Sequence, residues 1–152
     1  MAKILVVDDE KNIIKTLSSI LQDEGHIVYS SEDGESALSF LSKNTIDLII
    51  LDVWLPDIDG IELLETIKKL YDVSVIMISG HGSIDIAVKS TKLGAFDFIQ
   101  KPPAMERVLT SVNNAIEHIR LKRENIKLRQ ESHSLEEMIG TSGKINEIRE
   151  II

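Results

Sequence analysis

Short apolar segments alternate with amphipathic segments along the first hundred residues of the chain. Most of the apolar runs are rich in Val, Ile and Leu, which is typical of strands that are buried on both faces of a sheet. One run is more polar and fits a strand at the sheet edge. We predict strands at 4–7, 26–30, 48–51, 75–78 and 96–99.

The segments between these strands carry apolar residues at helical spacing, at 13–21, 37–41, 61–67 and 84–91. Glycine and proline residues lie between the proposed elements, where turns are needed. Such regular alternation indicates parallel strands joined by right-handed crossovers, with helices on both faces of the sheet. We therefore predict an α/β fold with a doubly wound, five-stranded parallel sheet.

From residue 104 onward the pattern changes, because no Gly or Pro interrupts the chain until Gly140. This predicts one long, extended C-terminal helix. Leu121, Leu128 and Leu135 recur every seven residues, and Asn125 follows the first of them by four. The spacing resembles a short coiled-coil seam, which favours a homodimer through this helix. A solvated single helix is the alternative.

Composition narrows the function classes. The 152 residues are 43% hydrophobic, enough for a core, and carry a formal net charge of −8. The acidic excess lies before residue 104, which argues against nucleic acid as a direct partner of this chain. The absence of Cys excludes disulfides, zinc ribbons and thiol catalysis. No long apolar run or signal peptide is present, so we expect a cytoplasmic protein without a membrane span.

Polar side chains follow four of the predicted strands. Asp8 and Asp9 follow the first, Asp52 the third, Ser79 the fourth and Lys101 the fifth. Each alone has an ordinary explanation as a helix cap, a turn residue, a loop hydroxyl or a solvated lysine. In an open parallel sheet, however, the ligand crevice lies outside the carboxyl ends of the strands. Together these residues predict one polar crevice.

Three carboxylates in one crevice repel one another unless a cation neutralises them. Mg²⁺ is the natural cation, because it prefers oxygen ligands, and Asp8, Asp9 and Asp52 would supply them. A metal there also offsets the charge that develops when a carboxylate attacks a phosphoryl group. Asp52 is the candidate nucleophile, Lys101 would neutralise a phosphoryl oxygen, and Ser79 would donate its hydroxyl to another.

Four motifs make the chain similar to a two-component response regulator receiver domain, from residue 2 to about residue 120. They are Ile-Leu-Val-Val-Asp-Asp-Glu at 4–10, Leu-Asp-Val-Trp-Leu-Pro-Asp-Ile-Asp-Gly at 51–60, Met-Ile-Ser-Gly at 77–80 and Phe-Ile-Gln-Lys-Pro at 98–102. The resemblance implies the flavodoxin-like strand order 2-1-3-4-5 of the chemotaxis receiver (CheY-like) fold.

The same resemblance implies roles for single residues. Asp52 would accept phosphate from a sensor histidine kinase, and the backbone carbonyl of Trp54 would complete the Mg²⁺ coordination by Asp8, Asp9 and Asp52. Ser79 and Phe98 occupy the positions of the switch hydroxyl and the switch aromatic residue. The family more often has Tyr at the latter position, and Phe98 lacks that hydroxyl.

Three further stretches, at 79–89, 106–107 and 138–148, resemble nitrogen-regulation activators of the NtrC and NtrX type. Those proteins add an ATPase that acts on sigma-54 polymerase, followed by a DNA-binding domain. We therefore expect a receiver at 1–120, a linker helix at 121–138, and the start of a truncated AAA+ ATPase at 139–152. The longer protein would contact DNA and sigma-54 polymerase, whereas this stretch would not. It has no GxxxxGK loop, so we expect that it does not bind ATP in that way.

Two other functions on the same fold are less well supported. A phosphatase of the haloacid-dehalogenase kind needs a second Asp two residues after the nucleophile, where this chain has Trp54. A nucleotide or flavin site would need a GxGxxG loop after the first strand, where the acids would instead repel phosphate. We expect a signalling receiver that catalyses only its own phosphorylation and slow dephosphorylation.

Overall fold

The computed structural model describes residues 1–81 and 84–140, with side chains as far as residue 128. The chain divides into two compact units, Met1–His118 and Ile119–Ile152. All five strands lie in the first unit.

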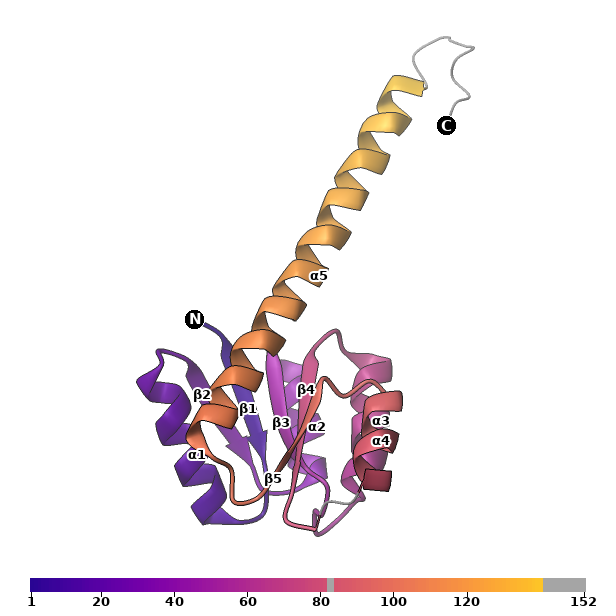
Figure 1. Cartoon of the computed structure of the whole chain (residues 1–152). Coiled ribbons are helices and arrows are strands. Elements are labelled where there is room, and N and C mark those ends of the chain that lie inside the picture. Colours follow the sequence, from indigo (N-terminus) through magenta and orange to yellow (C-terminus); the bar gives the residue numbers. More distant parts are fainter. Residues whose placement is uncertain (82–83, 141–152) are drawn as a thin grey trace. The chain divides into compact units, whose positions relative to one another are not determined.

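The first unit is built on a parallel sheet in the order β2-β1-β3-β4-β5, which confirms the predicted topology (Figure 1). All four neighbouring pairs are parallel, and the central strand β3 is buried along its whole length. The strands are β1 (Lys3–Val7), β2 (Ile27–Ser31), β3 (Leu48–Asp52), β4 (Ser74–Ser79) and β5 (Asp97–Gln100).

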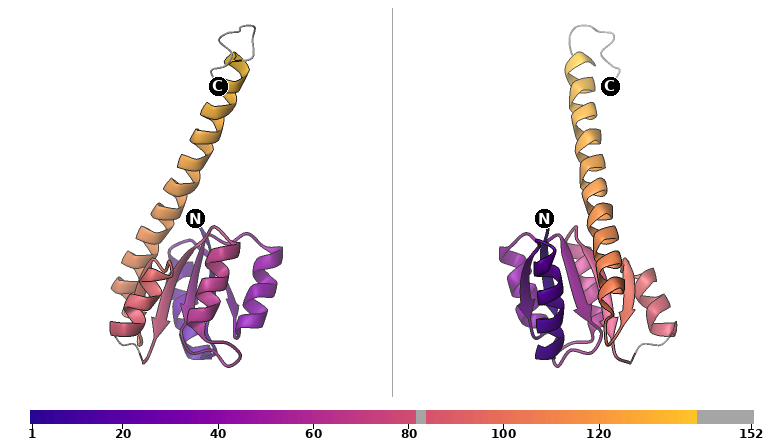
Figure 2. Two further views of the ribbon diagram at one scale, coloured as in Figure 1. Left: turned by 90° about the vertical axis from the view of Figure 1, so that its right-hand side faces the viewer. Right: turned by 60° about the vertical axis from the view of Figure 1, so that its left-hand side comes forward.

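Helices cover both faces of this sheet, as predicted for a doubly wound fold (Figure 2). They are α1 (Lys11–Asp23), α2 (Gly34–Lys43), α3 (Gly60–Leu70), α4 (Ile84–Lys92) and α5 (Met105–Gly140). On one face α1 and the first turns of α5 bury an apolar cluster that includes Leu17, Leu21 and Val112. On the other face α2, α3 and α4 pack over a second cluster, which includes Leu41 and Leu64.

Acidic side chains fix the starts of two helices. The Asp33 carboxylate accepts the N–H of Ser36 at 2.8 Å at the start of α2, and Asp59 accepts that of Ile61 at 2.8 Å at the start of α3. A third carboxylate, Asp57 in the β3–α3 loop, accepts two N–H groups of the first turn of α2, at 2.8 and 2.9 Å. These two bonds lower the pKa of Asp57 and tie the loop to α2.

A charged cluster joins β5 to α5. The Arg107 guanidinium donates two hydrogen bonds to the Asp97 carboxylate, at 2.7 and 2.9 Å, and a third to the carbonyl oxygen of Phe98 at 3.1 Å. The Ser111 hydroxyl also donates to Asp97, at 2.7 Å. The bonds from Arg107, with a smaller contribution from Ser111, outweigh burial and lower the pKa of Asp97 to about 2.

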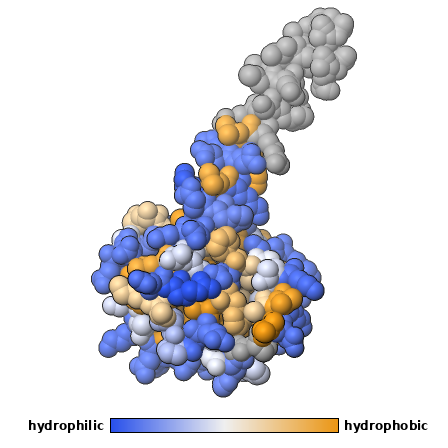
Figure 3. All heavy atoms as spheres, viewed as in Figure 1, coloured by the Kyte–Doolittle hydropathy of each residue, from blue (hydrophilic) through white to orange (hydrophobic). Residues whose placement is uncertain are grey.

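The second unit is described from Ile119 as a continuous helix with a mainly hydrophilic surface, on which separate apolar residues show (Figure 3). Leu121 and Leu128 are 50% and 58% exposed, and Asn125 is also exposed. The Leu135 side chain and residues 141–152 lie outside the described part of the chain, so the predicted seam and the ATPase start stay predictions. Within the described residues no helix is both long and apolar enough to cross a membrane.

Replacing Asp97 with Asn should destabilise the protein by about 1 kcal/mol at neutral pH, since the charge-assisted bonds from Arg107 are lost at a partly exposed site. The folded-state pKa near 2 lies below the ordinary value of 3.8, so this stabilisation is complete above about pH 4 and fades as pH falls towards 2. Urea unfolding of both proteins across this range measures the difference.

Glu65→Gln is the matched control, because Glu65 makes an exposed ion pair with Lys69 at 3.9 Å. Its effect should stay within about 0.5 kcal/mol at every pH. A difference between wild type and D97N that does not shrink between pH 4 and pH 2 would contradict the assignment.

Candidate functional site

Four polar residues lie at the carboxyl ends of neighbouring strands. Asp8 directly follows β1, Asp52 ends β3, Ser79 ends β4 and Lys101 directly follows β5. Asp8, Asp52 and Ser79 are buried. The sheet itself sets their positions, because Asp52 pairs in register with Ile78 and the Lys101 N–H donates to the Ser79 carbonyl at 2.9 Å.

The Lys101 ammonium lies among three carboxylates. Its Nζ is 2.9 Å from Asp8 Oδ2, 3.2 Å from Asp52 Oδ2 and 2.5 Å from Glu10 Oε1. Burial alone would lower the pKa of Lys101, but the contacts with Glu10 and Asp8 and the charge of Asp52 raise it above its ordinary value. Lys101 is therefore a permanent cation that holds the acidic side chains together.

Backbone amides occupy one oxygen of each buried carboxylate. Asp8 Oδ1 accepts the N–H of Glu10 at 2.8 Å, and Asp52 Oδ1 accepts the N–H of Trp54 at 3.2 Å. Asp8 Oδ2 accepts no hydrogen bond from the described residues, although it faces Lys101 as an ion-pair partner. A carboxylate oxygen has two lone-pair directions, so Asp8 Oδ2 can accept a second cation beside Lys101.

Burial and the negative charge of Asp8 raise the pKa of Asp52 to about 6, and only part of the shift is offset by the Trp54 N–H and by Lys101. The Lys101 ammonium therefore offsets the effects of burial and of the Asp8 charge only in part. One carboxylate oxygen from each of Asp8, Glu10 and Asp52 lies within 4.8 Å of the other two. An oxygen-only donor set of this size suits a hard divalent cation.

The loop after Asp52 is held close to the strand end by Gly60. The Gly60 N–H donates to the Val53 carbonyl at 2.8 Å, and Trp54 forms an isolated antiparallel bridge with Asp59. A Cβ atom on Gly60 would meet the Asp52 carbonyl oxygen and would lie 2.6 Å from Val53 Cα. Only glycine allows this approach, so the loop and the Asp52 backbone are positioned together.

A cavity of about 530 Å³ lies next to Asp52 and Lys101, at the carboxyl ends of the strands. Asp9, Glu10, Trp54, His81 and Lys101 are among the residues that line it. The rings of Trp54 and His81 meet edge to face, with centroids 6.1 Å apart. The peptide bond between Lys101 and Pro102 is cis.

The structure thus brings Asp8 and Asp52 into direct contact with Lys101. Asp9 is exposed and lines the cavity, but it lies outside the group of three clustered acids. Ser79 is buried at the adjacent strand end, and its Oγ accepts the His81 N–H at 3.0 Å.

Phe98 lies within β5 and packs against the apolar cluster under α2, α3 and α4. The prediction of site residues missed Glu10. The sequence feature that could have indicated it is the run of three consecutive acids after β1, of which Glu10 is the third. The long Lys101 side chain can reach this residue.

Sequence comparison decides the family. The protein-family model described as "Response regulator receiver domain" matches residues 4–113. The chain belongs to the response regulator receiver family. The chain is 41% identical, over 151 residues, to the nitrogen assimilation regulatory protein NtrX of Azorhizobium caulinodans, covering 96% of this chain and 33% of that protein. It is also 31% identical to the DNA-binding transcriptional regulator NtrC of Proteus hauseri, over 97% of this chain and 31% of that protein.

Solved structures agree with this assignment. NtrX from Brucella abortus in complex with ADP is 42% identical with a TM-score of 0.80, over 87% of this chain and 30% of that one. The beryllofluoride-activated NtrC4 receiver domain dimer is 41% identical with a TM-score of 0.75, over 78% of this chain and 99% of that one. The chain spans about a third of the length of the curated NtrX and NtrX-like relatives that it matches.

Proposed function

We propose that the receiver is a phosphorylation switch in which Asp52 accepts a phosphoryl group from the phosphohistidine of a sensor kinase. The observation that carries the proposal is the contact of Asp8, Asp52 and Lys101 at the carboxyl edge of the sheet. In the transfer, an Asp52 oxygen forms a bond to phosphorus as the phosphorus–nitrogen bond breaks. The electron pair of that bond returns to the imidazole of the kinase, which then takes up a proton.

The acidic cluster supports Mg²⁺ as the cofactor, since the oxygens of Asp8, Glu10 and Asp52 already converge and Asp8 Oδ2 lacks a hydrogen bond among the described residues. Asp9 and the Trp54 carbonyl complete the proposed set. When bound, Mg²⁺ offsets negative charge on the phosphoryl oxygens.

Lys101 and Ser79 have complementary roles in this proposal. The Lys101 ammonium, now shared among three acids, would move its charge to a phosphoryl oxygen. Ser79 Oγ accepts a backbone N–H from His81, which leaves its own proton available for another phosphoryl oxygen. Both groups stabilise the phosphorylated state more than the unphosphorylated one.

The output would run through β5. The phosphoryl group on Asp52 carries about 1.5 to 2 negative charges in place of the single carboxylate charge, and its acceptor oxygens draw the Ser79 hydroxyl inward. Phe98 follows, and the surface formed by α4, β5 and α5 changes. Phosphorylation would thereby alter homodimerisation through that surface and the long helix. In the longer protein, this would control a sigma-54 activator ATPase and transcription.

Replacing Asp52 with Asn should abolish phosphate incorporation from acetyl phosphate and Mg²⁺, because an amide oxygen is too weak a nucleophile to form the acyl phosphate. Intact mass measured under mild conditions, or retention on a phosphate-affinity gel, reports incorporation.

Asp23→Asn is the control, since Asp23 is exposed at the end of α1, and it should be phosphorylated like the wild type. Undiminished phosphorylation of D52N would overturn the proposal.

The phosphorylated receiver should lose its phosphate slowly, over minutes or longer at neutral pH. Trp54, which lines the cavity two residues after Asp52, cannot act as a general base on water. Trp54→Asp should speed the loss by about tenfold or more if its carboxylate positions a water, whereas Trp54→Phe should stay slow. Loss from the wild type within seconds would refute this and favour a phosphatase.

The equilibrium between monomer and dimer should shift when beryllofluoride and Mg²⁺ are added. Sedimentation velocity measures the proportions of the two species. The beryllofluoride-activated NtrC4 receiver is described as a dimer, which supports the test. Joint replacement of Leu121 and Leu128 by Ala should weaken any dimer by about tenfold or more through lost apolar burial.

Ile126→Ala is the control, because Ile126 is 39% exposed on the same helix but lies outside the seven-residue series. Equal dimer affinity in the double variant and the wild type would exclude the leucine seam.

A further inference from the structure

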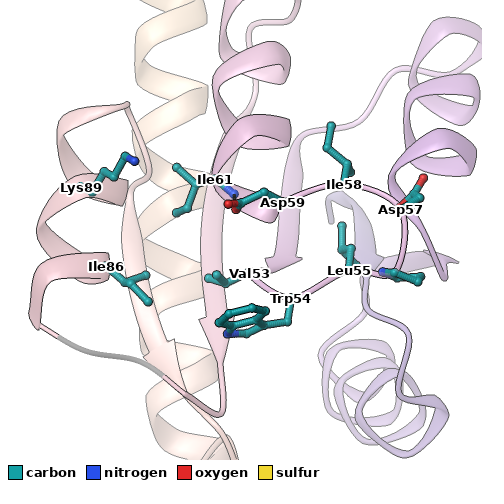
Figure 4. A pocket seen from close by; sticks show the side chains of 10 residues that line it. Val53, Trp54, Leu55, Asp57, Ile58, Asp59, Ile61, Ile86 and Lys89 are labelled. Atoms are coloured by element: carbon teal, nitrogen blue, oxygen red, sulfur yellow. Dashed lines mark hydrogen bonds between the residues drawn. The ribbon is translucent and has the colours of Figure 1, made fainter.

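A second cavity, of about 500 Å³, lies between the β3–α3 loop and α4 (Figure 4). Its lining is mostly apolar. Ile86 and Lys89 come from α4, and the side chains that line the cavity opposite them include Val53, Trp54, Leu55 and Ile61. A cavity of this size and composition, with few polar groups, is typical of sites for small molecules.

The two carboxylates on the loop side are already engaged. Both oxygens of Asp57 accept N–H groups at the start of α2, and Asp59 Oδ1 accepts the N–H of Ile61 at the start of α3. Each carboxylate therefore lies against a helix N-terminus, where the partial positive charge of the helix dipole offsets its own. Neither carboxylate therefore favours binding of a positively charged ligand in this cavity.

Lys89 differs from these acids. Its side chain is exposed, it extends from α4 towards the cavity, and no ion pair to it is found within residues 1–81 and 84–128. Ile86 lies one turn earlier on α4 and lines the same cavity. Residues three apart on a helix share a face, so this face presents an apolar contact and an ammonium together.

We infer that this cavity binds a small amphiphilic anion, with an apolar body against Ile86, Val53 and Trp54 and one acidic group at the Lys89 ammonium. The apolar body supplies affinity through burial, and the single charge sets the orientation.

The site is distinct from the phosphoacceptor cavity but adjoins it. Trp54 lines both cavities, and its N–H donates to Asp52 Oδ1. A ligand against one side of Trp54 would therefore lie next to the residue that helps to hold the Asp52 carboxylate.

The test uses 8-anilino-1-naphthalenesulfonate, which joins an apolar aromatic body to one sulfonate. Titration of the whole chain, without Mg²⁺ or phosphodonor, should show saturable binding of one dye per chain. Trp54 is the sole tryptophan, so energy transfer from it reports dye bound nearby. Because no phosphorylation is involved, the result does not depend on the proposed function.

The contact between the Lys89 ammonium and the sulfonate is tested by removing the charge first from the protein and then from the dye. Lys89→Met should weaken dye binding by about fivefold, since a charge-assisted contact is lost. Lys92→Met, which removes an exposed charge from the same helix outside the cavity, should leave it unchanged. N-phenyl-1-naphthylamine, the same body without the sulfonate, should bind the wild type less tightly than the sulfonate dye does and should bind wild type and K89M equally.

The apolar contact is tested with Ile86→Ser, which should weaken both dyes by about tenfold, against Val88→Ser, an exposed α4 position outside the cavity, which should have no effect. Circular dichroism and urea unfolding confirm that each variant is folded. Absence of saturable binding, equal affinity of K89M and wild type for the sulfonate dye, or weakening by V88S in place of I86S would each overturn the inference.

Discussion

Electrostatic repulsion between carboxylates at the end of the sheet is the constraint on which the site depends. Asp8 and Asp52 are almost without solvent contact, and burial of two like charges is costly unless cations compensate them. Lys101 supplies one positive charge to these two acids and to Glu10. Burial and the charge of Asp8 raise the pKa of Asp52 to about 6 despite the Lys101 ammonium. Three acids around one ammonium leave a net negative charge at the site, and such a site suits a divalent cation.

The rest of the fold keeps these charges from separating. The strands that carry them are joined by continuous parallel hydrogen bonding, and β3 lies between β1 and β4 with every residue buried. Gly60 then fixes the loop after Asp52 through a backbone approach that any side chain would prevent. The acids therefore cannot relieve their repulsion by moving apart, and a change in charge must be met by movement of loops and side chains at the edge.

The sequence predicted most of this arrangement, because apolar runs locate strands and the residues after parallel strands gather at one edge. Asp52 and Lys101 could be assigned in this way. The involvement of Glu10 could not, since it depends on the path of the Lys101 side chain. The bonds of Arg107 to Asp97 were also missed, because they join a strand to a helix across a turn and leave no periodic signal. The position of β2 shifted by one residue, to Ile27, with the ring of His26 accepting the Ala2 N–H.

The contact between Asp57 and the first turn of α2 has a consequence for how the loop after β3 can vary in length. Asp52 is fixed at one end by the sheet, and Asp57 is fixed at the other by two amides more than twenty residues earlier in the chain. An insertion or deletion between them would have to move Asp52 out of its buried position or break the hydrogen bonds between Asp57 and α2. The two fixed ends therefore set the number of residues between Asp52 and Asp57. Side chains in this stretch, such as that of Trp54, can differ without disturbing either end, whereas a change in the number of residues would disturb one of them.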